Sequence, residues 1–155
     1  MSITFTIPGP VEGKGRPRVT MQGGFARAYT PKDTANYENL VKVMYMQEAK
    51  GKAWMDKEPL RMIIIALQEI PKSVSKKQAA LMRTDVIRPT KKPDADNIAK
   101  IICDGLNGVA YHDDTQIVEL NVFKHYSDTP GVTVTIEEVN TDEGNNVGGR
   151  VVFDG

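Results

Sequence analysis

Five aspartates lie within residues 93–117, PDADNIAKIICDGLNGVAYHDDTQI, together with a single lysine. Like charges repel, so this density of carboxylates around an apolar, helix-forming stretch requires a compensating charge. Carboxylate oxygens are ligands of Mg²⁺, a hard cation that keeps several waters, binds phosphate oxygens and activates water for hydrolysis. The segment therefore predicts a Mg²⁺ site that acts on phosphate esters.

Residues 96–107 have the apolar periodicity of an amphipathic helix. At about 100° per residue, Asp96, Lys100 and Asp104 share one face and stand one turn apart. The opposite face is apolar and carries Ile98, Ile101, Ile102 and Leu106. Lys100 would then stand beside the metal, placed to bind a phosphate or to stabilise developing negative charge.

A second pair of carboxylates, Asp113 and Asp114, lies in a turn before the next predicted strand. A sheet packed on the helix brings this turn back beside Asp94 and Asp96. Four clustered carboxylates suit Mg²⁺, which in turn offsets their repulsion.

Taken singly, these residues also have structural explanations. Asp94 or Asp96 can cap the helix, and Asp104 can form an ion pair with Lys100. The isolated His112 is expected to be a turn residue rather than a general base.

The composition excludes several other classes of site. One cysteine and two histidines offer neither a disulfide nor a zinc site. GxSxG and Walker A motifs are missing, and GPVEGKG has the wrong spacing for a phosphate loop. The 155 residues suggest one domain. With no secretory signal or apolar run long enough to cross a membrane, we expect a cytoplasmic protein.

The formal net charge is zero, but the charge is divided along the chain. Residues 1–92 contain 17 Lys and Arg against 8 Asp and Glu, a balance of +9, and residues 93–155 contain 3 against 12, a balance of −9. This asymmetry suggests a polyanionic partner, although both signs can also mix on the folded surface and cancel.

The remaining pattern predicts an α+β fold. Strands are expected at 3–7, 60–69 (central), 116–124 and 132–138, helices at 30–50, 75–84 and 96–107, and loops at 8–19 and 88–94. Thr30 and Pro31 suit the start of the first helix, and Ser75 lies near the start of the second. Residues 140–155 are expected to form a polar, loose tail, whose last five residues either add an edge strand or do nothing.

The joint pattern of residues 92–117 resembles the signature of the RusA family of Holliday junction resolvases, in its phage and prophage branch. That signature is Asp-x-Asp-Asn at a helix start, a lysine and then an aspartate at successive turns, and Asp-Asp-x-Gln before an aliphatic residue. This chain supplies Asp94, Asp96, Asn97, Lys100, Asp104, Asp113, Asp114, Gln116 and Ile117. GKGRPRV and YTPKDTANYENLV also look like this family, and the resemblance covers a nuclease domain at residues 1–139.

The resemblance implies a small α+β fold, a mixed sheet with two main helices packed on it, that forms a homodimer. It implies binding of four-way DNA junctions and paired, Mg²⁺-dependent cuts in recombination and repair. It carries over catalytic roles to Asp94, Asp96 and Asp114, with Lys100 as helper and Asp113 as second choice beside Asp114. The expected metal ligands are Asp94, Asp96, Asp113 and Asp114.

Junction DNA is dense in phosphate, so basic residues must bind it. The candidates are Lys14, Arg16, Arg18, Arg88, Lys91 and Lys92, followed by Lys76 and Lys77. Phe25 and Tyr29 either stack on an exposed base or pack in the core. Two other functions stay open: a nuclease with broader specificity for branched or duplex DNA, and a non-catalytic DNA-binding or metal-stabilised module.

Overall fold

The computed structural model describes residues 1–15, 18–22, 25–29 and 32–139, and the side chains of 1–15 and 32–139. A four-stranded sheet has the order β1-β6-β4-β5. Its strands are β1 (Ser2–Pro8), β4 (Leu60–Glu69), β5 (Ile117–Ser127) and β6 (Gly131–Glu138). β4 and β5 run parallel, whereas the β1–β6 and β6–β4 pairs are antiparallel. The sheet is therefore mixed, as predicted.

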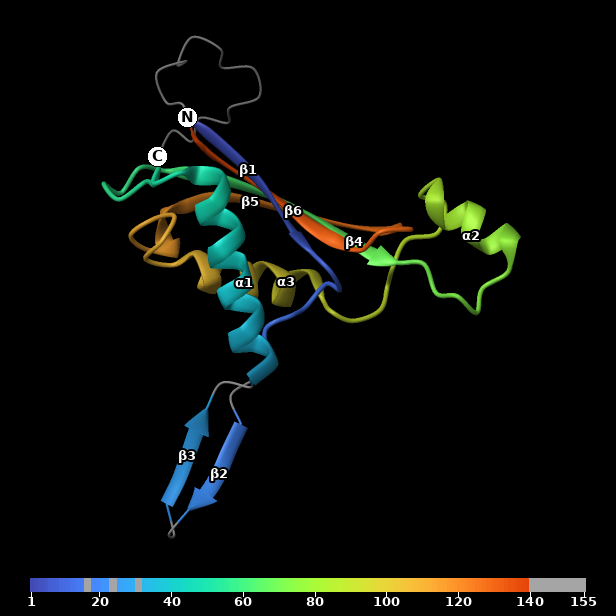
Figure 1. The fold of residues 1–155 in the computed structure, drawn as a ribbon, viewed down its shortest axis with the longest axis horizontal. Coiled ribbons are helices and arrows are strands. Elements are labelled where there is room, and N and C mark those ends of the chain that lie inside the picture. The colour runs from blue at the N-terminus through green and yellow to red at the C-terminus, as the bar shows by residue number, and fades with distance from the viewer. Residues whose placement is uncertain (16–17, 23–24, 30–31, 140–155) are drawn as a thin grey trace, which may run out of the picture.

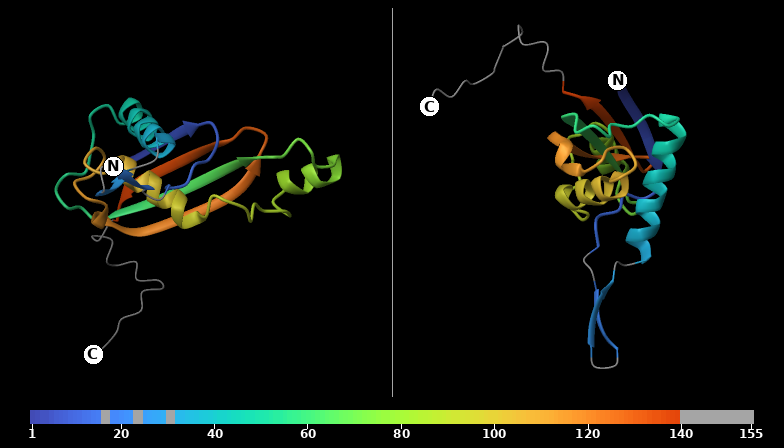
Figure 2. Two further views of the ribbon diagram at one scale, coloured as in Figure 1. Left: turned by 90° about the horizontal axis from the view of Figure 1, so that it is seen from below. Right: turned by 90° about the vertical axis from the view of Figure 1, so that its left-hand side faces the viewer.

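Two helices, α1 (Lys32–Ala49) and α3 (Ala95–Leu106), lie against one face of this sheet (Figures 1 and 2). A third helix, α2 (Lys76–Arg83), lies beyond one end of the sheet. This arrangement confirms the predicted α+β fold with two main helices. No helix in the described part of the chain is both long and apolar enough to span a membrane.

Alternating side chains on the strands explain why one face is covered. In β1, Ile3, Phe5 and Ile7 are buried while the residues between them are exposed. β4 follows the same period of two, with Met62 and Ile64 buried. Successive strand residues point to opposite faces, so these side chains meet the helices.

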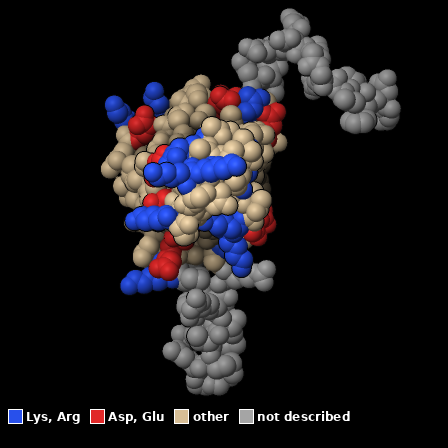
Figure 3. Space-filling model, turned by 90° about the vertical axis from the view of Figure 1, so that its right-hand side faces the viewer, with Lys and Arg blue, Asp and Glu red and all other residues tan. Residues whose placement is uncertain are grey.

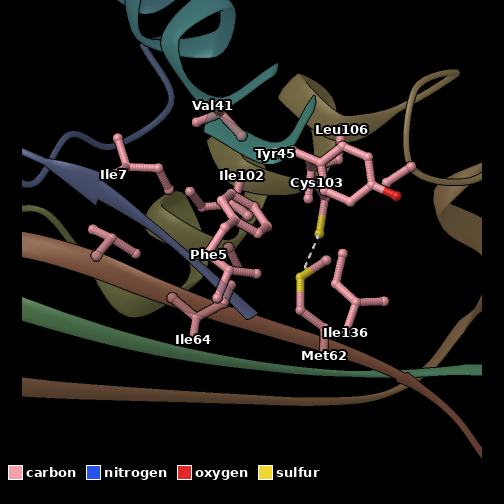
Figure 4. Close-up of a cluster of buried hydrophobic side chains, with 14 of the residues drawn as sticks. Phe5, Ile7, Val41, Tyr45, Met62, Ile64, Ile102, Cys103, Leu106 and Ile136 are labelled. Atoms are coloured by element: carbon pink, nitrogen blue, oxygen red, sulfur yellow. Dashed lines mark hydrogen bonds between the residues drawn. The ribbon is translucent and has the colours of Figure 1, made fainter. Parts of the chain in front are cut away.

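The core lies between this face and the two helices (Figure 4). The rings of Phe5 and Tyr45 meet edge to face with centroids 5.6 Å apart. Cys103 Sγ lies 3.9 Å from Met62 Sδ across the helix–sheet contact. The apolar side of α3, including the fully buried Ile101, thus anchors that helix and leaves its polar side outward.

Gly105 lets α3 approach α1 closely. A Cβ at this position would lie 3.2 Å from the Glu38 carbonyl oxygen and 3.2 Å from Val41 Cβ and Cγ1. These distances are shorter than ordinary van der Waals contacts, so a side chain here pushes the two helices apart.

α2 packs on a second, smaller hydrophobic cluster. Its buried members are Ile70, Ala79 and Met82, with Val74, Ile87 and Tyr126 packed around them. Ser75 caps the helix, because its Oγ accepts a hydrogen bond from the Gln78 backbone N–H at 3.1 Å. This confirms the predicted helix start.

The sequence prediction missed a hairpin. β2 (Arg18–Gln22) and β3 (Phe25–Tyr29) form a separate antiparallel pair that extends away from the sheet (Figure 1), where the pattern favoured a loop. The side chains of Phe25 and Tyr29 and the whole of Thr30, Pro31 and 140–155 lie outside the described residues. The stacking and tail predictions therefore remain predictions.

Candidate active site

α3 carries the acid–base–acid row predicted from the sequence. Its apolar face is buried in the core, so Asp96 and Lys100 face outward and are exposed. Lys100 Nζ lies 3.2 Å from Asp104 Oδ1, the expected i,i+4 pair. Asp94 occupies the N-cap position, and its side chain makes no capping hydrogen bond. Its carboxylate is exposed and available for another role.

The second pair of aspartates is held at the start of a short 3₁₀ helix, η1 (Asp114–Gln116), that leads into β5. The side chain of Asn107, just after α3, accepts a hydrogen bond from the Asp114 backbone N–H at 3.2 Å. Tyr111, fully buried, donates its hydroxyl to the Cys103 carbonyl at 2.8 Å. Both bonds tie the turn to the C-terminal half of α3, which fixes where Asp114 lies relative to the helix.

The side chain of Gln116 also holds this turn in place. It is 6% exposed. Its Oε1 accepts the backbone N–H groups of His112 at 2.8 Å and Asp113 at 3.1 Å. Its Nε2 donates to the carbonyls of Trp54 at 3.0 Å and Glu58 at 3.2 Å. The amide thus uses its full bonding capacity to join the Asp113–Asp114 turn to the loop before β4.

Asp96, Lys100 and Asp114 line one depression of about 320 Å³. The rest of its lining is largely apolar and consists of Ala99, Cys103, Ile117 and Leu120. Two carboxylates and an ammonium therefore meet over an apolar floor, where charge interactions are stronger than in open water.

The electrostatics of Asp114 reflect this crowding. Burial raises its pKa, and the neighbouring carboxylates of Asp113 and Asp104 raise it further, while Lys100 lowers it. Interaction with the Asp114 side chain lowers the pKa of the exposed Asp113. The negative charge on Asp114 is thus less favourable than on a free aspartate, and binding of a metal cation there would relieve the repulsion between the carboxylates.

A second lysine supports the row from the N-terminal segment. Lys14 Nζ lies 2.5 Å from Glu38 Oε1 and 3.0 Å from Asp104 Oδ2. Asp104 is therefore shared by Lys14 and Lys100. Burial lowers the pKa of Lys14, but its bonds to the two carboxylates outweigh this and raise the pKa overall.

Gly13 allows the N-terminal segment to reach the start of α3. A Cβ on Gly13 would lie 2.8 Å from Pro93 Cβ and 3.2 Å from Asn97 Cβ. Next to it, the Lys14 backbone N–H donates to the Asn97 carbonyl at 3.0 Å. The Gly15 N–H donates to Thr34 Oγ1 at 3.1 Å, so this segment joins the beginnings of α1 and α3.

Not all predicted ligands come together. Asp94 and Asp113 do not line the depression that Asp96 and Asp114 share. Across the described residues, no group of three or more His, Cys, Asp or Glu side chains is arranged to hold a metal ion. The donor chemistry still fits Mg²⁺, which takes one or two carboxylates and fills its other positions with water and phosphate oxygens.

The predicted DNA-binding residues are scattered over several elements. Lys76 and Lys77 are exposed in the first turn of α2, and Arg88, Lys91 and Lys92 are exposed in the segment before α3. Arg16 and the side chain of Arg18 lie outside the described residues. Lys14 is held by carboxylates, a structural role that the sequence did not suggest. DNA contact by each of these residues remains a prediction.

Two positioning roles were missed at the sequence level. Asn107 carried no signal beyond its place after a helix. Gln116 was part of the recognised motif, but its role as a buried tie was not predicted. Gln116 lies at the start of a predicted strand, at a position whose side chain points toward the core. A polar side chain at such a position is usually buried and hydrogen-bonded, and this was the available signal.

The chain resembles known proteins over most of its length. The chain is similar to the uncharacterized protein YqaN of Bacillus subtilis (strain 168), with 35% identity over 139 residues that cover 88% of this chain and 96% of the relative. The family model for the endodeoxyribonuclease RusA matches residues 8–137, which include β4, β5, most of β6, the three helices and both aspartate pairs. The chain therefore belongs to the RusA endodeoxyribonuclease family.

Proposed function

We propose that this protein is a Mg²⁺-dependent endodeoxyribonuclease that resolves four-way DNA junctions by paired, symmetrical strand cuts. The observation that carries the proposal is the meeting of Asp96, Lys100 and Asp114 in one depression of a RusA-family chain. Carboxylates supply the oxygen ligands, and the lysine supplies a positive charge for a phosphate.

Asp96 and Asp114 would hold the metal in this proposal, with water and phosphate oxygens in its other positions. Asp94 at the helix start and Asp113 in the turn are the further candidate ligands, although neither lines the depression. When bound, Mg²⁺ lowers the pKa of a coordinated water and offsets the charge of the phosphate. Lys100, which is 58% exposed, donates to a non-bridging oxygen of the scissile phosphate.

The shared ion pair makes this role of Lys100 energetically accessible. Lys100 must leave Asp104 to reach a phosphate. Lys14 remains 3.0 Å from Asp104 Oδ2 and keeps that carboxylate paired. The cost of breaking one ion pair is then small, since a second cation stays in place.

Junction binding requires cations around the site. We propose that Arg88, Lys91 and Lys92 contact phosphates beside the start of α3, with Lys76 and Lys77 farther along. Arg16 and Arg18 belong to the same proposal. Because each such contact releases counterions, affinity falls as salt rises. A homodimer with two-fold symmetry would present two identical sites to the matched strands of a junction.

The test is cleavage of a labelled synthetic four-way junction beside a linear duplex of the same arms, with and without Mg²⁺. The Asp96→Asn variant is compared with Asp33→Asn, which removes an exposed carboxylate at the start of α1. We expect paired nicks only in the junction, lost in Asp96→Asn and kept in Asp33→Asn. Asp96→Asn should still bind the junction, because it loses a negative charge near phosphate.

Other outcomes separate the alternatives. Equal cutting of the duplex indicates a nuclease of broader specificity. Tight junction binding without cutting under any divalent metal indicates a non-catalytic module. Loss of both binding and cutting in Asp96→Asn makes that residue a structural one.

A further inference from the structure

A pocket of about 470 Å³ opens where the end of β4 passes the segment before α3. It is separate from the carboxylate depression, with which it shares no lining residue. Prolines at positions 10, 71, 93 and 130 form much of its apolar wall. The volume is in the range of small-molecule sites. Proline rings offer rigid, apolar surfaces that carry no hydrogen-bond donor.

The polar side of the pocket is basic. Lys72, Lys91 and Lys92 line it, against one carboxylate, Glu69. Within the described residues, none of these three lysines forms a salt bridge. Figure 3 shows Lys and Arg side chains across the end of the molecule that carries α2. The rim therefore attracts a polyanion.

Gln68 lines the same pocket and is 7% exposed. Its Nε2 donates to the Lys92 carbonyl at 3.1 Å. Its Oε1 is buried and has no hydrogen-bond partner among the described residues. Buried acceptors are nearly always paired, so this oxygen lacks a donor that either a water or a ligand entering the pocket would supply.

A short segment of chain, held in place on both sides, connects the pocket to the start of α3. Lys92 and Pro93 line it, and Asp94 follows directly. Pro93 is packed against Gly13, and Lys92 is tied to Gln68. The pocket and the start of α3 are therefore neighbours along the chain, with Asp94 next to the pocket wall.

We propose that the pocket holds one unstacked nucleotide of the DNA substrate. Lys72, Lys91 and Lys92 bind its flanking phosphates, the proline rings pack on the base, and Gln68 Oε1 accepts a hydrogen bond from an N–H group on the base edge. The proposal rests on the proposed function in so far as the ligand is DNA.

The experiment uses 2-aminopurine, whose fluorescence rises when the base leaves the stack. It is placed in turn at each position flanking the crossover of a four-way junction, and also in a single-stranded oligonucleotide. Both are titrated with the full chain carrying Asp96→Asn, so that no cutting is needed. Gln68→Leu and Lys72→Ala are added separately, with the exposed Lys52→Ala as the matched control. Free 2-aminopurine nucleotide is the third ligand.

We expect a fluorescence rise at one junction position and in the single strand. Affinity in the single strand should be about tenfold weaker in Gln68→Leu and in Lys72→Ala, and unchanged in Lys52→Ala. Lys72 is exposed, so its variant remains informative if Gln68→Leu does not fold.

The proposal is overturned if no 2-aminopurine position shows a fluorescence rise, or if the rise is unchanged in both Gln68→Leu and Lys72→Ala. Binding of the free nucleotide as tightly as of the strand overturns its role in DNA. If the wild-type chain cuts nothing but the response appears and needs Gln68 and Lys72, the pocket stands and the proposed nuclease function falls. If the wild-type chain cuts the junction but no 2-aminopurine position responds, the proposed nuclease function stands and the nucleotide pocket falls.

Discussion

Gln116 is the residue whose loss should damage the site most without removing a catalytic group. Gln116→Leu keeps a side chain of similar length but leaves four backbone groups of the turn and the preceding loop without their partner. Each lost hydrogen bond costs about 1 kcal/mol, and more where the orphaned group stays buried. We expect the free energy of unfolding to fall by about 4 kcal/mol, a large part of the 5–15 kcal/mol typical of a domain.

Gln116→Glu separates the two halves of this network. The variant keeps an oxygen for the His112 and Asp113 N–H groups but sets a carboxylate against the Trp54 and Glu58 carbonyls. The repulsion between this carboxylate and the two carbonyls ends when the carboxyl group is protonated, because it can then donate a hydrogen bond to one of them. This variant should therefore regain stability as the pH falls, whereas Gln116→Leu should not.

Urea denaturation followed by circular dichroism measures both effects. Gln47→Leu is the matched control, because Gln47 is exposed on α1. Junction cleavage, assayed where each variant is fully folded, should fall in both Gln116 variants, since the turn that carries Asp114 is loosened. A loss of stability below about 1 kcal/mol in Gln116→Leu, no larger than one average hydrogen bond, would refute the network as described.

Three further predictions concern packing, ionisation and capping. Gly105→Val should lower the free energy of unfolding by about 2–3 kcal/mol, because it forces α1 and α3 apart. The control Ala80→Val, at an exposed position of α2, should lower it by less than about 1 kcal/mol. Equal losses of stability in urea denaturation would contradict the close approach of the helices. Burial raises the pKa of the Cys103 thiol to about 11 from 9.0, so the unfolded state releases its proton first and stability should fall as pH rises from 9 to 11. Cys103→Ala should flatten that fall, and an unchanged slope would show that the thiol does not contribute. Ser75→Ala removes the cap of α2 and should speed amide exchange there about fivefold, from a loss of about 1 kcal/mol; unchanged exchange would show that the cap is not needed.

Local patterns predicted most of the fold. The alternation in 3–7 and the apolar run at 60–69 correspond to β1 and β4, and the periodicity of 96–107 corresponds to α3. These succeeded because each element buries a face whose period can be read directly along the chain. The hairpin was missed because the glycines and prolines of residues 8–19 favoured a loop, although Gly23-Gly24 between two β-prone runs is a known turn signal.

The site was predicted in part for a similar reason. Asp96, Lys100 and Asp104 lie one turn apart on a single helix, so their shared face follows from spacing alone. Lys14 is bound to Glu38 and Asp104, 24 and 90 residues away, and spacing along the chain carries no information about such pairs. The separation of Asp94 from the depression depends on the path of the chain before α3, which a pattern does not specify.

Because the small cluster beneath α2 is separate from the main core, changes to the α2 segment should leave the rest of the fold intact. Residues 70–87 bury Ile70, Ala79 and Met82 against one another and not in the main core. Such a segment can open, shorten or accept inserted residues while the sheet and both aspartate pairs keep their places. It is therefore where members of this family can be expected to differ in length, and where a tag or an added binding module can be inserted with the least effect on the carboxylates.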